Sequence, residues 1–96
     1  MDRKKLSAEE IEAALKDLSG WNVESDNLKK RLTFANFAES LAFVNKAGEI
    51  AESRDHHPDI LFGWGYAEFS ITTHDAGGIT AFDFALAKEI EEIERG

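Results

Sequence analysis

Residues 36–74, NFAESLAFVNKAGEIAESRDHHPDILFGWGYAEFSITTH, decide the fold because they join one long helix to two strands. Apolar side chains recur at helical spacing over residues 37–51, which predicts an amphipathic helix. Pro58 disfavours helical backbone at the residue before it, so this helix must end there. Residues 60–64 and 67–73 then read as a strand pair with a turn between them.

The predicted helix carries a broad apolar stripe and one glycine. Asn36 is placed to cap it, with Glu39 three residues on. Gly48 costs about 1 kcal/mol relative to alanine inside a helix, so we expect close packing against another backbone there. The stripe that we expect to be buried comprises Phe37, Leu41, Val44, Ala47 and Ala51, widened by Phe43 and Ile50.

A helix and a hairpin precede this segment. Ser7 and Glu10 have the spacing of a capping box, which predicts a helix over about residues 7–18. Residues 21–24 and 28–34 alternate between apolar and polar side chains, with turn-forming residues between them. This part of the chain therefore reads as helix, strand, strand.

A third helix follows. Thr80 and Asp83 have a variant of the capping-box spacing at its start, and its apolar stripe comprises Phe82, Leu86, Ile90 and Ile93. The predicted order is αββαββα. We expect one α+β domain over residues 1–96, with a four-stranded antiparallel sheet and the three helices packed on one face.

The composition excludes several classes of protein. The 96 residues include no cysteine, which rules out disulfides, thiolate catalysis and Cys-ligated metal sites. No apolar run approaches the roughly 20 residues of a membrane span, and the chain opens with polar residues. We therefore expect a soluble, cytoplasmic protein with no membrane partner.

The net charge of −8 argues against direct binding of nucleic acid, because a phosphate backbone needs a basic face. The basic clusters are residues 3–5 and 29–31. The second cluster is bracketed by apolar residues, as on a solvated strand face. We expect no direct contact with DNA or RNA.

The three histidines, His56, His57 and His74, all fall in the segment that decides the fold. The first two lie where the long helix meets a strand, and the third lies where the last strand meets a loop. Such junctions are places where side chains from distant segments converge on a pocket. Imidazole both donates and accepts protons near neutral pH, so the cluster suggests proton-transfer chemistry.

Three interpretations of this cluster stay open from the residues alone. In the first, His56 and His57 are junction residues that bond exposed carbonyls, and His74 lies on the solvent face. In the second, they bind a metal with Asp55, Asp59 and Asp75, although no His-x-x-x-His or His-x-His pair is present. In the third, they form an acid–base site whose rings are oriented by nearby acids such as Glu52 and Asp83.

A longer pattern narrows this choice. It comprises Glu52-Ser53-Arg54-Asp55-His56-His57-Pro58-Asp59, then Thr73-His74, Gly78-Ile79-Thr80, Asp83 and Ala87. The chain resembles the pterin-4a-carbinolamine dehydratase family at these positions and over nearly its whole length. The resemblance implies a lyase that converts 4a-hydroxytetrahydropterin to quinonoid dihydropterin plus water, recycling the cofactor of aromatic amino acid hydroxylases. It implies neither a metal nor an organic cofactor.

The resemblance also implies roles for single residues. His56 and His74 match the family's acid–base histidines, and His57 matches a histidine that binds and orients the pterin ring. Glu52 and Asp83 match acids that support the site. The positions that line or adjoin the pterin site are matched by Asp55, Thr72, Thr73, Asp75 and Trp21.

Two positions depart from the family's pattern. Asp59-Ile60 and Trp64-Gly65 stand where the family commonly has acid-tryptophan and Tyr-Asn, which bears on the substrate's side chain rather than on the reaction. Some animal members act as dimerisation cofactors for a transcription factor, so the alternative function is a protein-interaction module without a catalytic role. We expect a homodimer or homotetramer.

Overall fold

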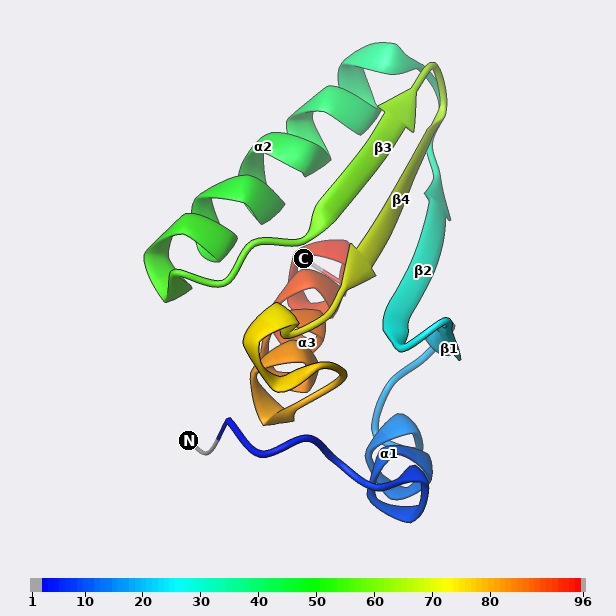
Figure 1. Cartoon of the computed structure of the whole chain (residues 1–96). Coiled ribbons are helices and arrows are strands. Elements are labelled where there is room, and N and C mark those ends of the chain that lie inside the picture. Colours follow the sequence, from blue (N-terminus) through cyan, green and yellow to red (C-terminus); the bar gives the residue numbers. More distant parts are fainter. Residues whose placement is uncertain (1–2, 96) are drawn as a thin grey trace.

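The computed structural model describes residues 3–95, which form three α-helices, four strands and one short 3₁₀ turn (Figure 1). The predicted order αββαββα is confirmed. In chain order the elements are α1 (Ala8–Leu15), β1 (Asn22–Glu24), β2 (Asn27–Thr33), α2 (Phe37–Arg54), β3 (Asp59–Gly63), β4 (Tyr66–Ile71), η1 (His74–Ala76) and α3 (Ala81–Arg95).

The four strands form one antiparallel sheet in the order β1-β2-β4-β3. β2 and β4 are the central pair, with Leu28 opposite Ile71 and Leu32 opposite Ala67. All four of these side chains are buried, because they point to the face that the helices cover. The predicted α+β class with an antiparallel sheet is therefore confirmed.

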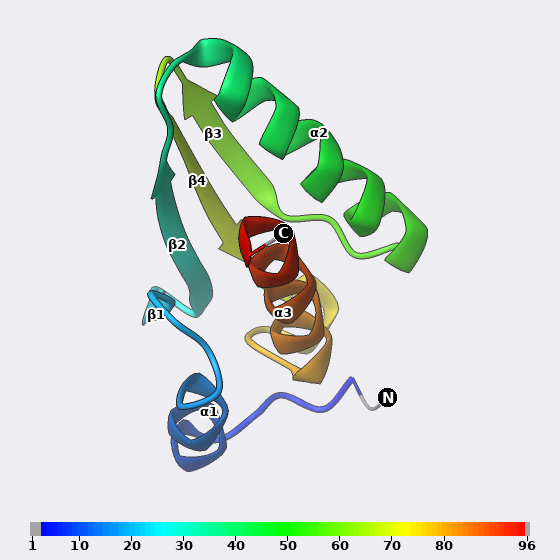
Figure 2. The same ribbon diagram turned by 180° about the vertical axis from the view of Figure 1, so that it is seen from behind.

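The helices leave the other face of the sheet open. Figure 2 shows α2 and α3 lying across the strands, with α1 beyond the β1 end of the sheet. Along β4 the alternation follows the prediction, because Ala67, Phe69 and Ile71 are buried and the residues between them are partly exposed. Antiparallel sheets commonly show this division, with one packed face and one solvated face.

Helix α2 buries Phe43, Ala47 and Ala51 of the predicted stripe, but not the residues at its N-terminal end. Phe37 and Leu41 are 44% and 38% exposed. The buried hydroxyl of Ser40 donates to the carbonyl of Gly63 at 2.6 Å, which fixes this face of α2 against the end of β3. The buried residues of α2 are Ser40, Phe43, Ala47 and Ala51. Of these, sequence periodicity missed Ser40, because a small polar residue gives no apolar signal.

The prediction that Gly48 packs against another backbone is wrong. A Cβ atom at this position would meet nothing within 4 Å. Gly48 instead borders an open hollow on the outside of α2, beside Val44 and Ile60. Among residues 3–95, no close contact offsets the conformational cost of this glycine.

Helix α1 is shorter than predicted but is capped as predicted. The Ser7 hydroxyl accepts from the Glu10 amide at 3.1 Å, and the Glu10 carboxylate accepts from the Ser7 amide at 2.9 Å. The helix ends at Leu15, and turns over residues 16–18 complete the segment. No helix within residues 3–95 is long and apolar enough to cross a membrane.

The sequence indicated that Lys30 lies on a solvated strand face, but the structure buries its side chain. Its side chain is only 8% exposed and lies on the covered side of β2. The ammonium group donates to the carbonyl of Ser19 at 2.7 Å and to the carboxylate of Glu94 at 2.8 Å. Glu91 lies 3.9 Å from the same group. The interior lysine is therefore charge-paired, and it ties β2 to the end of α3.

Candidate active site

The three histidines line one cavity of about 320 Å³ where α2, β4 and η1 come together. Its walls are formed by Arg3, Asp55, His56, His57, Thr72, Thr73, His74 and Asp75. A larger hollow of about 430 Å³ lies beside β1 and β2, but no histidine borders it. The smaller cavity is therefore the candidate site, because it gathers the groups that transfer protons near neutral pH.

Asp55 sets the directions of the two adjacent histidines. It ends α2 in left-handed backbone, with φ 52° and ψ 41°. The amides of Asp55 and His56 donate to the carbonyls of Glu52 and Ala51, both at 3.1 Å. Aspartate tolerates this conformation better than most residues. After this turn His56 is buried and His57 is exposed.

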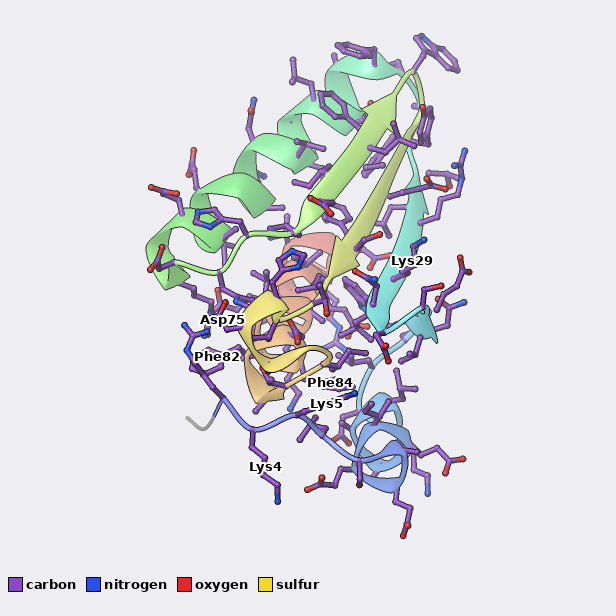
Figure 3. All side chains as sticks on the ribbon, in the orientation of Figure 1. Lys4, Lys5, Lys29, Asp75, Phe82 and Phe84 are labelled. Carbon is purple, nitrogen blue, oxygen red and sulfur yellow. The ribbon has the colours of Figure 1, made fainter. Side chains whose placement is uncertain are left out.

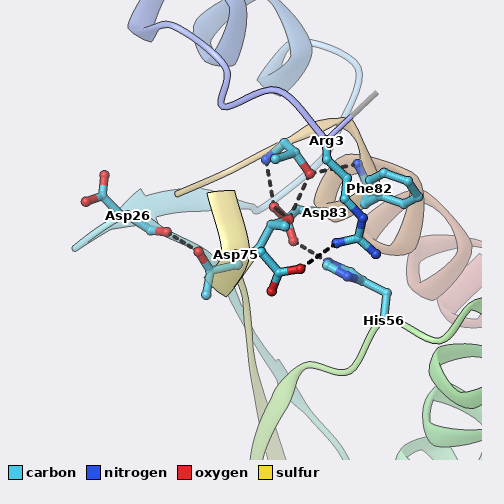
Figure 4. A network of polar contacts seen from close by, with 9 residues as sticks. Arg3, Asp26, His56, Asp75, Phe82 and Asp83 are labelled. Atoms are coloured by element: carbon cyan, nitrogen blue, oxygen red, sulfur yellow. Dashed lines mark hydrogen bonds and ion pairs between the residues drawn. The ribbon is translucent and has the colours of Figure 1, made fainter. Parts of the chain in front are cut away.

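Asp83, buried in the first turn of α3, anchors His56 (Figure 4). Its Oδ1 atom lies 2.6 Å from Nε2 of His56. Its Oδ2 atom accepts from the hydroxyl of Thr73 at 2.9 Å and from the amide of Thr80 at 2.8 Å. Both carboxylate oxygens therefore have partners, as buried charge requires.

The hydrogen bonds around Asp83 run in one direction. Because the Thr73 hydroxyl donates to Asp83, the Thr80 hydroxyl 2.8 Å away must donate to Thr73. The Thr80 oxygen in turn accepts from the amide of Phe82 at 3.2 Å. Because the oxygens of a carboxylate only accept, the tautomer of His56 that fits this network donates from Nε2 to Oδ1 of Asp83. Nδ1 of His56 is then the ring nitrogen left to exchange a proton with a bound molecule.

His57 has a carboxylate partner of its own. Its Nε2 atom lies 2.6 Å from Oε1 of Glu52, which is five residues earlier in the last turn of α2. Both side chains are largely exposed, at 56% and 81%. Glu52, the second acid that the sequence assigned to the site, therefore contacts His57 but does not line the histidine cavity; it borders the hollow on the outside of α2.

His74 begins η1 and closes the cavity from the side of β4. The loop after it is fixed by a bridge between Thr73 and Gly78, and Gly77 adopts a positive φ of 74°. The ring of His74 is exposed. No hydrogen bond to that ring is found within residues 3–95, so it is available to a bound molecule.

Two residues of the site were not predicted from the sequence. Arg3 lines the cavity, and its guanidinium lies 5.0 Å from the centre of the Phe82 ring. Phe82 also packs against His56, with 5.9 Å between ring centres. No local signal places Arg3 here, because its ion-pair partner Asp75 is 72 residues away in the chain.

Trp21 does not reach this cavity. It is 7% exposed and belongs to the hydrophobic core. The Lys30 ammonium lies 6.0 Å from the centre of its ring. Its Nε1 atom has no hydrogen-bond partner among the described residues. The structure therefore does not bring Trp21 to the three histidines.

The end of α2 is also held by an ion pair. Arg54 donates through Nε to Glu89 of α3 at 2.8 Å, and its Nη2 contacts the same oxygen. The hydrogen bond to Glu89 raises the pKa of Arg54 above its ordinary value. This pair joins α2 to α3 directly before the histidines. Within residues 3–95, no group of three or more His, Asp or Glu side chains is arranged to hold a metal ion.

The fold and the cavity together define a small α+β protein with a polar, histidine-lined site. The chain belongs to the pterin 4 alpha carbinolamine dehydratase family, whose model matches residues 4–93. A protein of Rubrobacter xylanophilus that carries the provisional name pterin-4-alpha-carbinolamine dehydratase is 44% identical over 89 residues. That match covers 92% of this chain and 83% of the relative.

Solved structures share the fold. A protein of Brucella melitensis described as a transcriptional coactivator/pterin dehydratase superposes with a TM-score of 0.90 at 26% identity, over 94% of this chain and 98% of the other. A pterin dehydratase-like protein described as a RuBisCO assembly factor in the alpha-carboxysome gives a TM-score of 0.62 at 22% identity. The second match covers 75% of this chain and 83% of the other, and it shows a common fold alone.

Proposed function

We propose that this protein removes water from 4a-hydroxytetrahydropterin by histidine acid–base catalysis. The observation that carries the proposal is the convergence of His56, His57 and His74 on one cavity. Membership of the dehydratase family supports the substrate class. Imidazoles suit the reaction because each step moves one proton near neutral pH.

The proposed reaction needs one acid and one base. The acid protonates the hydroxyl at carbon 4a, and the carbon–oxygen bond breaks to release water. Electrons of the adjacent ring nitrogen form the new carbon–nitrogen double bond, and the base takes the proton of that nitrogen. The product is quinonoid dihydropterin. His56 and His74 share these two duties, each worth typically 10²–10⁴ in rate.

The remaining wall of the cavity suits a flat polar ring. His57 orients the ring, with Glu52 as its carboxylate partner at 2.6 Å. Asp55, Thr72, Thr73 and Asp75 offer hydrogen-bonding groups around the cavity. Asp83 holds His56 in the tautomer that donates from Nε2. The product then returns, after reduction, to an aromatic amino acid hydroxylase as its cofactor.

A direct assay tests the proposal. The 4a-hydroxytetrahydropterin is generated in place, and its loss is followed by ultraviolet absorbance with and without the protein. We expect the wild type to accelerate the loss, and His56→Ala and His74→Ala each to slow it by about 10²-fold or more. Circular dichroism of both variants checks that the fold is intact. Full activity in the double variant would overturn the acid–base assignment.

A second candidate is an interaction module without a catalytic role. Leu61 on the edge strand β3 and Trp64 in the next turn are 59% and 71% exposed, which suits assembly with another chain. We propose a homodimer or homotetramer on this basis. A wild type that self-associates in sedimentation but does not accelerate dehydration would favour this candidate over the enzyme.

A further inference from the structure

Among the described residues, Arg3 is the only arginine or lysine that lines the cavity. Its guanidinium lies over the face of Phe82, 5.0 Å from the ring centre. Figures 3 and 4 place Phe82, Asp75 and the N-terminal segment together at the mouth of the site. A guanidinium stacked in this way keeps its position while its N–H donors remain available.

Arg3 and Asp75 belong to the exposed rim of the cavity, together with Asp55, His57 and His74, whereas Thr73 and His56 form its floor. The Arg3 and Asp75 side chains are 54% and 79% exposed. Thr73 and His56 are 2% and 8% exposed. A pterin ring held against the floor would leave its substituent at the exposed rim, where Arg3 is the only arginine or lysine among the described lining residues. Arg3 is therefore placed to meet the substrate's side chain rather than its ring.

The ion pair between Arg3 and Asp75 is open to exchange. Only Nη1 of the guanidinium reaches the carboxylate, at 3.4 Å, and both partners are solvated. Exposed pairs of this kind contribute little, and long distances weaken them further. Arg54 differs, because two of its nitrogens contact Glu89 from partly buried positions. A ligand anion that accepts two hydrogen bonds would therefore replace Asp75 as the partner of Arg3, and the solvent around the exposed Asp75 screens the repulsion between the two anions.

We propose that Arg3 selects pterins whose side chain carries an anion, either a phosphate or a carboxylate. Both groups accept two parallel hydrogen bonds from one guanidinium, which Asp75 does not do. Arg3 acts here as a specificity residue for the site, and this inference rests on the proposed function. The chemistry of the cavity floor is the same for neutral and anionic substrates.

The test measures binding first, because binding does not depend on turnover. Stable oxidised pterins are fluorescent, and three are compared: one with a neutral hydroxylated side chain, one phosphorylated and one carboxylated. We expect the wild type to bind at least one anionic ligand about tenfold more tightly than the neutral one. Arg3→Gln should reduce this ratio to about one, and Arg3→Lys should retain part of it.

Lys29→Gln is the matched control. It removes the same unit of charge from β2, where Lys29 pairs with Glu24 and lies apart from the site (Figure 3). We expect this variant to keep the wild-type ratio. A wild type that binds all three ligands equally, or an equal fall of the ratio in Lys29→Gln, would overturn the inference.

Turnover then separates this inference from the proposed function. The ratio of kcat/KM between anionic and neutral 4a-hydroxy substrates should fall about tenfold in Arg3→Gln, through KM. If no substrate is dehydrated but the binding ratio depends on Arg3, the proposed function fails and the anion subsite stands. If all substrates are dehydrated and Arg3→Gln leaves the kcat/KM ratio unchanged, the anion subsite is contradicted and the proposed function stands.

Discussion

The adjacent residues His56 and His57 each pair with a carboxylate. The nitrogen–oxygen distance is 2.6 Å both in His56–Asp83 and in His57–Glu52. Their surroundings are opposite. The side chains of the first pair are 9% and 0% exposed, and those of the second are 56% and 81% exposed. Asp83 also accepts from Thr73 and Thr80, whereas no second donor to Glu52 is found within residues 3–95.

The difference shows that distance alone does not measure what a pair contributes. A solvated pair exchanges its partners with water, so its net value is at most about 1 kcal/mol. A buried carboxylate has no water to replace a lost donor, so breaking its network leaves an unpaired charge. His56–Asp83 therefore fixes a tautomer and an orientation, whereas His57–Glu52 is adjustable.

Asp83→Asn should have the largest effect, because it breaks the buried pair from its centre. An amide offers one acceptor atom instead of two, so Thr73, Thr80 and His56 cannot all donate to it. We expect dehydration to slow by about 10²–10³-fold and the free energy of unfolding to fall by about 3 kcal/mol. Single-turnover kinetics and urea unfolding measure the two effects. A rate within threefold of wild type would contradict the role given to Asp83.

Thr80→Val should have the next largest effect, because Thr80 supports the His56–Asp83 pair indirectly, through its hydrogen bond to Thr73. The valine removes the hydroxyl that bonds Thr73 and keeps the amide that donates to Asp83. We expect a loss of about 1–2 kcal/mol in unfolding free energy and about tenfold in rate. Thr80→Ser keeps the hydroxyl and should restore most of the rate. Equal losses in both variants would show that packing, rather than the hydrogen bond, matters at this position.

Glu52→Gln probes the exposed pair and should have a small effect. The amide still offers His57 an acceptor, and solvent screens the lost charge. We expect a change of less than about 1 kcal/mol in unfolding free energy and about two- to fivefold in rate. The same kinetic and urea experiments measure it. A loss as large as that of Asp83→Asn would erase the distinction between the two pairs.

Glu10→Gln should have the smallest effect and serves as a reference for an exposed carboxylate. Hydrogen bonds from Ser7, first from its amide and then from its hydroxyl, lower the pKa of Glu10 below its ordinary value. The charged form thus stabilises the fold above the ordinary pKa, and this contribution disappears as the pH falls through the lowered pKa. Thermal unfolding across the acid range should be less pH-dependent in the variant. An unchanged acid dependence would contradict this contribution.

Local sequence signals predicted the fold well, because they act over short distances. The capping box of Ser7 and Glu10 and the N-cap at Asn36 are present as expected. Alternation along β2 and β4 predicted the buried side of the sheet. Periodicity predicted the buried Phe43, Ala47 and Ala51 of α2 but failed in its first turn, where Phe37 is exposed and Ser40 is buried. A hydrophobic pattern cannot predict that a small polar residue is more buried than a large apolar one.

The site was predicted only in part, because its contacts are long-range. The family pattern named Asp83 as a supporting acid, and the structure places it against His56, 27 residues away. Arg3 was missed because the N-terminal segment crosses the η1 loop only in the folded chain, where the amide of Leu6 donates to the carbonyl of Ile79 at 2.8 Å. Neither spacing nor composition encodes such a crossing.

The most direct measurement is a double-mutant cycle on the dehydration rate with His56→Gln, Asp83→Asn and both together. If Asp83 acts through His56, removing it after His56 has been replaced should cost almost nothing. The predicted result is a double variant within about threefold of His56→Gln alone. Losses that multiply, so that the double variant is slower by the product of the two single effects, would contradict the claim that the buried pair works as one unit.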